Sequence, residues 1–182
     1  MLPEGIPLQV YLANKFGEKV AKQELKGQGP LAKAAKSVGI KFDPDRYVVN
    51  SIKSHLLLQF VFENYGPEKE SEVRNLLCQQ YFEEAVNLHS DKVLQMLAER
   101  CGVDKVKALE FFTSPTSVKR LHSEIQKTKK KGILGVPHFV IYIDGYNDKR
   151  PVTFSGGQNK SGFVDTFNKL LKEYHKANKT KH

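Results

Sequence analysis

The sequence contains only two cysteines, Cys78 and Cys101, and no tryptophan. Because the two thiols lie 23 positions apart, the chain carries no CxxC pair, no disulfide framework and no cysteine-based zinc site. No apolar run approaches the roughly 20 residues that a membrane-spanning helix requires. Met1–Gly5 also lacks the basic and apolar parts of a secretory signal. These absences predict a soluble protein in a reducing, cytoplasmic setting, with no membrane partner.

The length and apolar content predict a globular protein. The chain has 182 residues, of which 40% are hydrophobic and 10% aromatic, a composition that excludes a disordered or fibrous protein. A chain of this length buries roughly two-thirds of its unfolded surface, so it needs neither a disulfide nor a metal to fold. We expect one domain, or one domain with a large insertion. The histidines show no metal-ligand spacing, and no metal site is expected.

Positive charge is concentrated in the second part of the chain. The net charge is +9, and residues 101–182 hold 16 basic and 7 acidic side chains, which accounts for all of it. Such a surface is typical of proteins that bind nucleic acid or an acidic partner. However, the lysine run at Lys127 and Lys129–Lys131 lacks interleaved aromatics and arginines, and it equally fits a solvated helix end. We therefore do not expect nucleic-acid binding.

Apolar residues at helical spacing predict a predominantly helical chain. Gly17, Gly66 and Gly102 mark helix ends, and Gly27 with Pro30 divides one long segment into two pieces. The predicted helical segments are 8–16, 18–38 in two pieces, 52–65, 67–82, 90–101, 106–112, 118–131 and 163–171. The segment 52–65 is apolar around much of its circumference, so we expect it at the centre of a helical cluster.

The pattern changes near the C-terminus. Residues 139–143 are β-branched and aromatic, which predicts a buried strand, and 152–154 predicts its hairpin partner after the turn at Asp144–Gly145. No segment before residue 139 has the pattern of a strand. A buried strand needs covered faces and paired edges, so the predicted sheet is incomplete.

The segment Gly135–Ile141, followed by the hairpin, by Ser155-Gly156-Gly157-Gln158 and by a closing helix, resembles the C-terminal half of a thioredoxin fold. More closely it resembles the DsbA family of thioredoxin-like proteins, in its FrnE-like branch. The resemblance implies that the Val136–Pro137 peptide is cis, and that Val136, Pro137 and His138 form the cis-proline loop that lines the substrate groove. An exposed position at the start of the strand is the alternative for His138.

Other segments carry the same likeness. Asn50-Ser51-Ile52-Lys53-Ser54-His55 resembles the signature of the branch's helical insertion, in which Asn50 and His55 are the matching positions. The likeness extends from Leu2 to about Tyr174. It implies a predominantly helical α/β protein, an incomplete thioredoxin-like fold with a large all-helical insertion. We expect residues 1–132 to form the insertion with its connecting segment, 133–176 the thioredoxin-like half, and 177–182 a basic tail.

Individual polar and sulfur-containing residues carry further expectations. We expect His55 to be a core imidazole rather than a catalytic one. Cys78 shares a helix face with Tyr81 and Phe82 and is expected to be a buried apolar residue. Cys101 is expected at a helix C-terminus, where the helix dipole disfavours the thiolate.

The family's chemistry depends on a CxxC motif that precedes the segment resembled by Leu2–Gly5, and Met1 stands where that segment begins. We therefore expect a relative of the protein-disulfide oxidoreductases that is inactive for thiol–disulfide exchange as this chain. It is either a truncated form or a natural remnant, and whether it is an enzyme stays open. The expected partner is a thiol-containing peptide or protein, or glutathione as a ligand; no resident cofactor is expected. We also expect a homodimer that completes the sheet.

Two alternatives remain. One is a glutathione-dependent isomerase or transferase related to 2-hydroxychromene-2-carboxylate isomerase, in which Val136 and Pro137 would present backbone groups to glutathione. The other is a non-catalytic helical protein-interaction module that uses the basic C-terminal surface.

Overall fold

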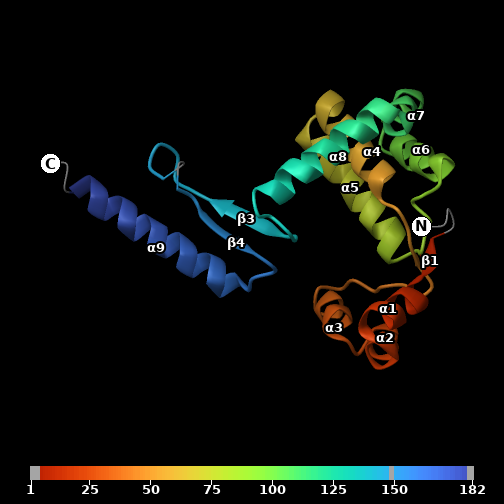
Figure 1. Cartoon of the computed structure of the whole chain (residues 1–182), viewed down its shortest axis with the longest axis horizontal. Helices are drawn as coiled ribbons and strands as arrows, with labels where there is room; N and C mark the ends of the chain where they lie inside the picture. Colours follow the sequence, from red (N-terminus) through yellow and green to blue (C-terminus); the bar gives the residue numbers. More distant parts are fainter. Residues whose placement is uncertain (1–4, 148–149, 180–182) are drawn as a thin grey trace. The chain divides into compact units, whose positions relative to one another are not determined.

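The computed structural model describes residues 5–147 and 150–179 of the chain, which divides into two compact units, Met1–His122 and Ser123–His182. The sequence placed the division ten residues later, after residue 132. Within the described ranges the secondary structure, drawn in Figure 1, runs in the order β1 (Ile6–Pro7), α1 (Leu8–Phe16), α2 (Glu18–Leu25), α3 (Pro30–Ser37), β2 (Tyr47–Val48), α4 (Ile52–Tyr65), α5 (Pro67–Phe82), α6 (Asp91–Arg100), α7 (Lys105–Thr113), α8 (Pro115–Lys130), β3 (His138–Ile141), β4 (Val152–Ser155) and α9 (Lys160–Lys179).

The helix ends follow the local chemistry that the sequence indicated. Gly17 and Gly66 have φ of +85° and +86°, a conformation that a residue with a side chain rarely adopts, and each separates two helices. The Oδ1 atom of Asp104 accepts hydrogen bonds from the backbone N–H groups of Val106, at 3.0 Å, and Lys107, at 3.1 Å, and so caps α7. These bonds favour the ionised carboxylate, and the Lys107 N–H is the largest cause of the lowered pKa of Asp104.

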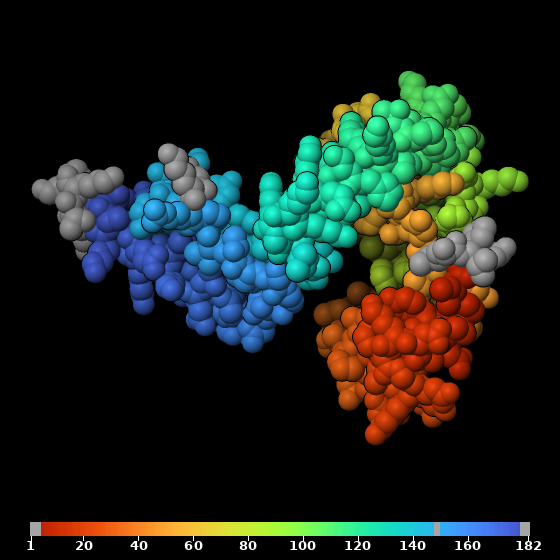
Figure 2. Space-filling model, viewed as in Figure 1, coloured from red at the N-terminus to blue at the C-terminus, as the bar shows by residue number. Residues whose placement is uncertain are grey.

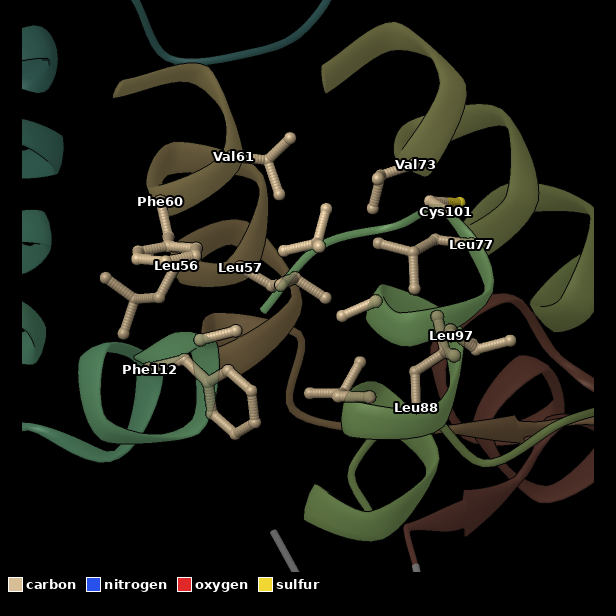
Figure 3. Close-up of a cluster of buried hydrophobic side chains, with 14 residues drawn as sticks. Leu56, Leu57, Phe60, Val61, Val73, Leu77, Leu88, Leu97, Cys101 and Phe112 are labelled. Carbon is tan, nitrogen blue, oxygen red and sulfur yellow. The ribbon is translucent and has the colours of Figure 1, made fainter. Parts of the chain in front are cut away.

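The core of the first unit lies among α4, α5, α6 and α7, with α4 in the middle, as the sequence predicted. Helix α4 contributes Leu56, Leu57, Phe60 and Val61 to the buried cluster. Figure 3 shows these side chains directed toward the residues of the neighbouring helices that complete the cluster, among them Val73, Leu77, Leu97 and Phe112. The cluster is a single apolar core built from consecutive helices.

The three short helices α1, α2 and α3 form a separate part of this unit, which we call the N-terminal lobe (residues 5–49). Its two ends are joined by a short antiparallel ladder that sequence patterns did not predict: Ile6 pairs with Val48 and Pro7 with Tyr47. Strands of two residues are too short to show an alternating pattern. The expectation that no strand precedes residue 139 was therefore wrong.

Arg46 connects this lobe to the helical core. The side chain is 7% exposed, and its guanidinium carbon lies 4.8 Å from the ring centroid of Phe42 and 5.3 Å from that of Phe82. The Nη1 atom donates to the backbone oxygens of Asp43, at 2.9 Å, and Phe82, at 3.4 Å. Burial lowers the pKa of Arg46, while Tyr81 and Asp43 favour its charged form. The guanidinium is thus both stacked and hydrogen-bonded where the lobe meets the C-terminal end of α5.

The second unit contains the β3–β4 hairpin and the long helix α9, which run side by side in Figure 1. Strand β3 ends at Ile141 rather than at residue 143. The Ile143 backbone belongs to the turn instead: its N–H donates to Asn147 Oδ1 at 2.7 Å, and its carbonyl accepts from the Tyr146 N–H at 3.0 Å. The prediction of a buried strand was also wrong, since the Val140 side chain is 51% exposed and no residue of β3 is fully buried.

Candidate functional site

The segment before β3 presents apolar side chains to solvent. Leu134 is 84% and Val136 91% exposed, and Pro137 is exposed as well. The Val136–Pro137 peptide bond is cis, as the resemblance implied. Apolar side chains that are so fully hydrated contribute nothing to the stability of the fold, so substitutions at Val136 change the surface without changing the core.

The backbone of this cis-proline loop (Val136, Pro137 and His138) is held by the residues that follow β4. The N–H of Gly156 donates to the carbonyl oxygen of Pro137 at 2.8 Å. Gly156 adopts φ +90°, a conformation suited to glycine, which turns the chain back across the loop. Next to this bond, Nδ1 of His138 lies 2.7 Å from Oγ of Ser155. The Val-Pro-His and Ser-Gly-Gly segments that the sequence singled out are therefore in direct contact.

The hairpin register explains why these two segments meet. His138 pairs with Ser155 and Phe139 with Phe154 in the antiparallel ladder, so the first residue of β3 lies opposite the last residue of β4. The link between His138 and Ser155 was not predicted from the sequence. The signal that would have found it is the position of the turn, because the turn fixes which residues are opposite each other.

An aromatic cluster supports the hairpin from the side of α9. The ring centroids of Phe139 and Phe154 are 5.2 Å apart, and Phe163 from α9 contacts both, at 4.9 and 5.5 Å. The first turn of α9 is capped by Asn159, whose Oδ1 accepts from the Gly162 N–H at 2.9 Å. The start of β3 and the end of β4 are therefore fixed by packing, and the exposed loop projects from a rigid base.

Asn50 and His55 belong to the other unit. Asn50 Oδ1 accepts from the Ile52 N–H at 3.0 Å and so positions the first turn of α4. The expectation of a core imidazole at position 55 was wrong, because His55 is exposed. The buried residues of α4, which include Ser54, Leu57 and Val61, share one side of the helix, and His55 lies on the opposite side.

The two cysteines are both free thiols in the first unit. The prediction for Cys78 was wrong: it is exposed, because α5 buries Val73 and Leu77, and position 78 lies about 140° around the helix from Val73. Cys101 ends α6 and is 6% exposed. Its thiol pKa is raised, chiefly by burial and then by the Glu72 carboxylate. The direction agrees with the prediction, but burial rather than the helix dipole is the main cause.

The cis-proline loop offers exposed apolar side chains and the start of a strand whose outer edge has no partner within residues 5–147 and 150–179. In that same part of the chain, no three His, Cys, Asp or Glu side chains are grouped as a metal site. No helix there has the length and apolarity to cross a bilayer. Unpaired strand edges of this kind are where extended peptides add to a sheet through backbone hydrogen bonds in other proteins.

Comparisons with known proteins identify the fold. A crystal structure of a probable DsbA oxidoreductase from Streptomyces coelicolor superposes with a TM-score of 0.73 at 20% identity, covering 92% of this chain and 68% of that one. No curated protein matches in sequence. The family described as the DSBA-like thioredoxin domain matches residues 14–168, a range that includes α2 to α8 and the cis-proline loop. The predicted fold class, a predominantly helical α/β thioredoxin-like fold, is thereby confirmed, and the chain belongs to the family of DSBA-like thioredoxin domains.

Proposed function

We propose that this chain binds a thiol-containing peptide, of which glutathione is the simplest case, at the cis-proline loop, and that it does not itself catalyse thiol–disulfide exchange. Membership of the DSBA-like family supports the first part. The observation that carries the second is the state of the sulfur atoms: Cys101 is buried with a raised thiol pKa, Cys78 is on α5, and neither has a CxxC partner in the 182 residues.

The electronic requirements of disulfide exchange explain the expected inactivity. A thiolate must attack one sulfur of the substrate disulfide, the other substrate sulfur must leave, and a second thiol must then resolve the mixed disulfide. Burial disfavours the Cys101 thiolate. Cys78 is accessible but has no second cysteine within three positions of it in the sequence. The chain therefore lacks a pair that could complete the cycle.

In an insulin-reduction assay with dithiothreitol, we expect this chain to leave the uncatalysed rate unchanged. The variants Cys78→Ser and Cys101→Ser should behave like the parent, and thioredoxin serves as the positive control. Titration with a chromogenic disulfide should find one thiol accessible in the native state and a second only after unfolding. Turnover that disappears on either serine substitution would overturn the proposal of an inactive chain.

The binding part of the proposal is tested separately, by titrating glutathione into the chain in an isothermal titration calorimeter. Val136→Asp should weaken glutathione binding by about tenfold or more, because the new carboxylate repels a tripeptide with two carboxylates and one ammonium group. Since Val136 is 91% exposed, the unfolding midpoint should not move. Val106→Asp is the matched control, at an exposed valine on α7. Equal weakening by both variants, or no binding by the parent, would contradict binding at the loop.

We also propose that two copies of the chain pair through the open outer edge of β3 and form a homodimer. Val140 and Tyr142 expose 51% and 54% of their surface beside that edge, and exposed apolar strands are sites of association unless they are protected. We expect light scattering at micromolar concentration to give twice the mass of one chain, and Val140→Lys to give the single-chain mass, with Val106→Lys as the control. A monomeric parent would exclude the dimer.

A further inference from the structure

The N-terminal lobe contains a cavity of about 940 Å³ that neither the core nor the cis-proline loop includes. Small-molecule sites in proteins have volumes of roughly 300–1,000 Å³. Each helix of the lobe contributes to its wall, and so does the following loop: the lining includes Leu12 and Phe16 from α1, Val20 from α2, Leu31 from α3, and Ile40 and Phe42. Figure 2 shows one face of this lobe, in red and orange.

No large apolar side chain of the lobe is fully buried, and several are exposed. The buried apolar residues of the lobe are two alanines, Ala21 and Ala35, while Phe16, Val20 and Leu31 expose 54%, 39% and 59% of their surface. The reason is geometric: α2 packs against both α1 and α3, but α1 and α3 make no close backbone approach to each other. Apolar area that lines a cavity instead of filling a core is typical of a binding site for an apolar molecule.

Charge at the cavity is unbalanced toward the positive. Lys26, Lys36 and Lys41 line it, and none of them forms an ion pair within the described part of the chain. Two acidic residues also line the cavity. The carboxylate of the first, Glu24, lies against Gly29 and occupies the space that a side chain at position 29 would need. The other, Asp43, accepts the Asp45 N–H at 2.8 Å and interacts with the Arg46 guanidinium.

We propose that this cavity binds an amphipathic organic anion, a ligand with an apolar chain and one carboxylate. The apolar wall takes the chain, which gains the free energy of removing its surface from water. The three lysines at the rim take the carboxylate, and their flexible stems allow the ammonium groups to reach it. The site is a second one, in a different unit from the cis-proline loop, and does not depend on thiol chemistry.

The probe is dodecanoate, below its micelle-forming concentration, titrated into the full chain by isothermal titration calorimetry. We expect one saturable site per chain. Dodecyltrimethylammonium, which has the same chain length and the opposite charge, should bind about tenfold more weakly or not at all. No saturable binding of dodecanoate, or equal binding of the two probes, would overturn the proposal.

Two pairs of variants test where dodecanoate binds. Lys36→Glu combined with Lys41→Glu should weaken binding about tenfold or more, whereas Lys33→Glu, on α3 but outside the lining, should stay within about twofold of the parent. Leu31→Asp should weaken binding similarly, with Val38→Asp, which is 70% exposed and outside the lining, as its control. If the controls lose as much affinity as the lining variants, the binding is non-specific and the proposal fails.

An experiment with lipid vesicles distinguishes binding of a soluble ligand from binding to a lipid surface. If the cavity takes single amphipathic anions from solution, the chain should not bind anionic vesicles. The fraction of protein that sediments with phosphatidylglycerol vesicles should then be no larger than the fraction that sediments with phosphatidylcholine vesicles. Retention on phosphatidylglycerol together with no binding of soluble dodecanoate would show a membrane-surface contact instead, and would overturn the assignment of a soluble ligand.

Discussion

Replacing Phe112 by alanine is expected to lower the free energy of unfolding by about 3–5 kcal/mol. The Phe112 side chain is fully buried in α7 and is one of the largest members of the cluster among α4, α5, α6 and α7. Truncation loses the transfer free energy of the ring and leaves a cavity that a well-packed core fills only in part. Since domains of this size have a total stability of about 5–15 kcal/mol, the variant should be partly unfolded at 37 °C. Urea denaturation followed by circular dichroism measures the loss.

The matched control is Phe62→Ala, which deletes the same atoms from a helix of the same cluster. Phe62 is 56% exposed, on the outer side of α4. Its truncation should change the free energy of unfolding by no more than about 0.5 kcal/mol. If the two alanine variants are destabilised alike, the core does not lie where α4 and α7 meet.

Replacing Arg46 by alanine should release the N-terminal lobe from the helical core, with a loss of about 2–4 kcal/mol. The substitution removes two hydrogen bonds from a charged donor to backbone oxygens and the stacking on Phe42 and Phe82. The connection that remains includes the 2.8 Å bond from the Asp43 N–H to the Phe82 carbonyl oxygen. Hydrogen exchange should therefore accelerate in residues 5–49 and remain slow in α4–α7.

Two further arginine variants make this result specific. Arg46→Lys keeps the charge but loses the planar donor group, so it should lose part of the stability. Arg74→Ala removes an exposed arginine that pairs with Glu70 on the surface of α5, and it should cost no more than about 1 kcal/mol. Uniformly faster exchange in the lobe and the core after Arg46→Ala would show that the two parts unfold as one.

Helix positions could be predicted well from the sequence because glycine, proline and capping residues act locally. Gly17, Gly66 and Ser90 stand at helix ends in both the prediction and the structure. Which side of a helix is buried could not be predicted as well. His55 and Cys78 were misplaced because that choice depends on the neighbouring helices. Each has one apolar and one polar neighbour in the sequence, so the local pattern does not decide which side is buried.

The candidate site also has parts that the sequence could predict and parts that it could not. The residues of the cis-proline loop could be named from the sequence, since the motif is continuous. The bond from the Gly156 N–H to the Pro137 carbonyl and the contact between His138 and Ser155 depend on the hairpin register. The long connection between the strands, residues 142–151, allows several registers, so the sequence leaves this one open. The cavity was not predicted because periodic leucines and phenylalanines have the same pattern whether a helix packs against a core or lines an empty space.

The ladder between Ile6–Pro7 and Tyr47–Val48 places the entry and exit of the N-terminal lobe side by side. A segment with adjacent ends constrains the rest of the fold mainly through the spacing of those ends, and here also through the contacts of Arg46 and Asp43 with Phe82. The lobe can therefore lengthen, shorten or be exchanged among relatives while the helices that follow keep their arrangement.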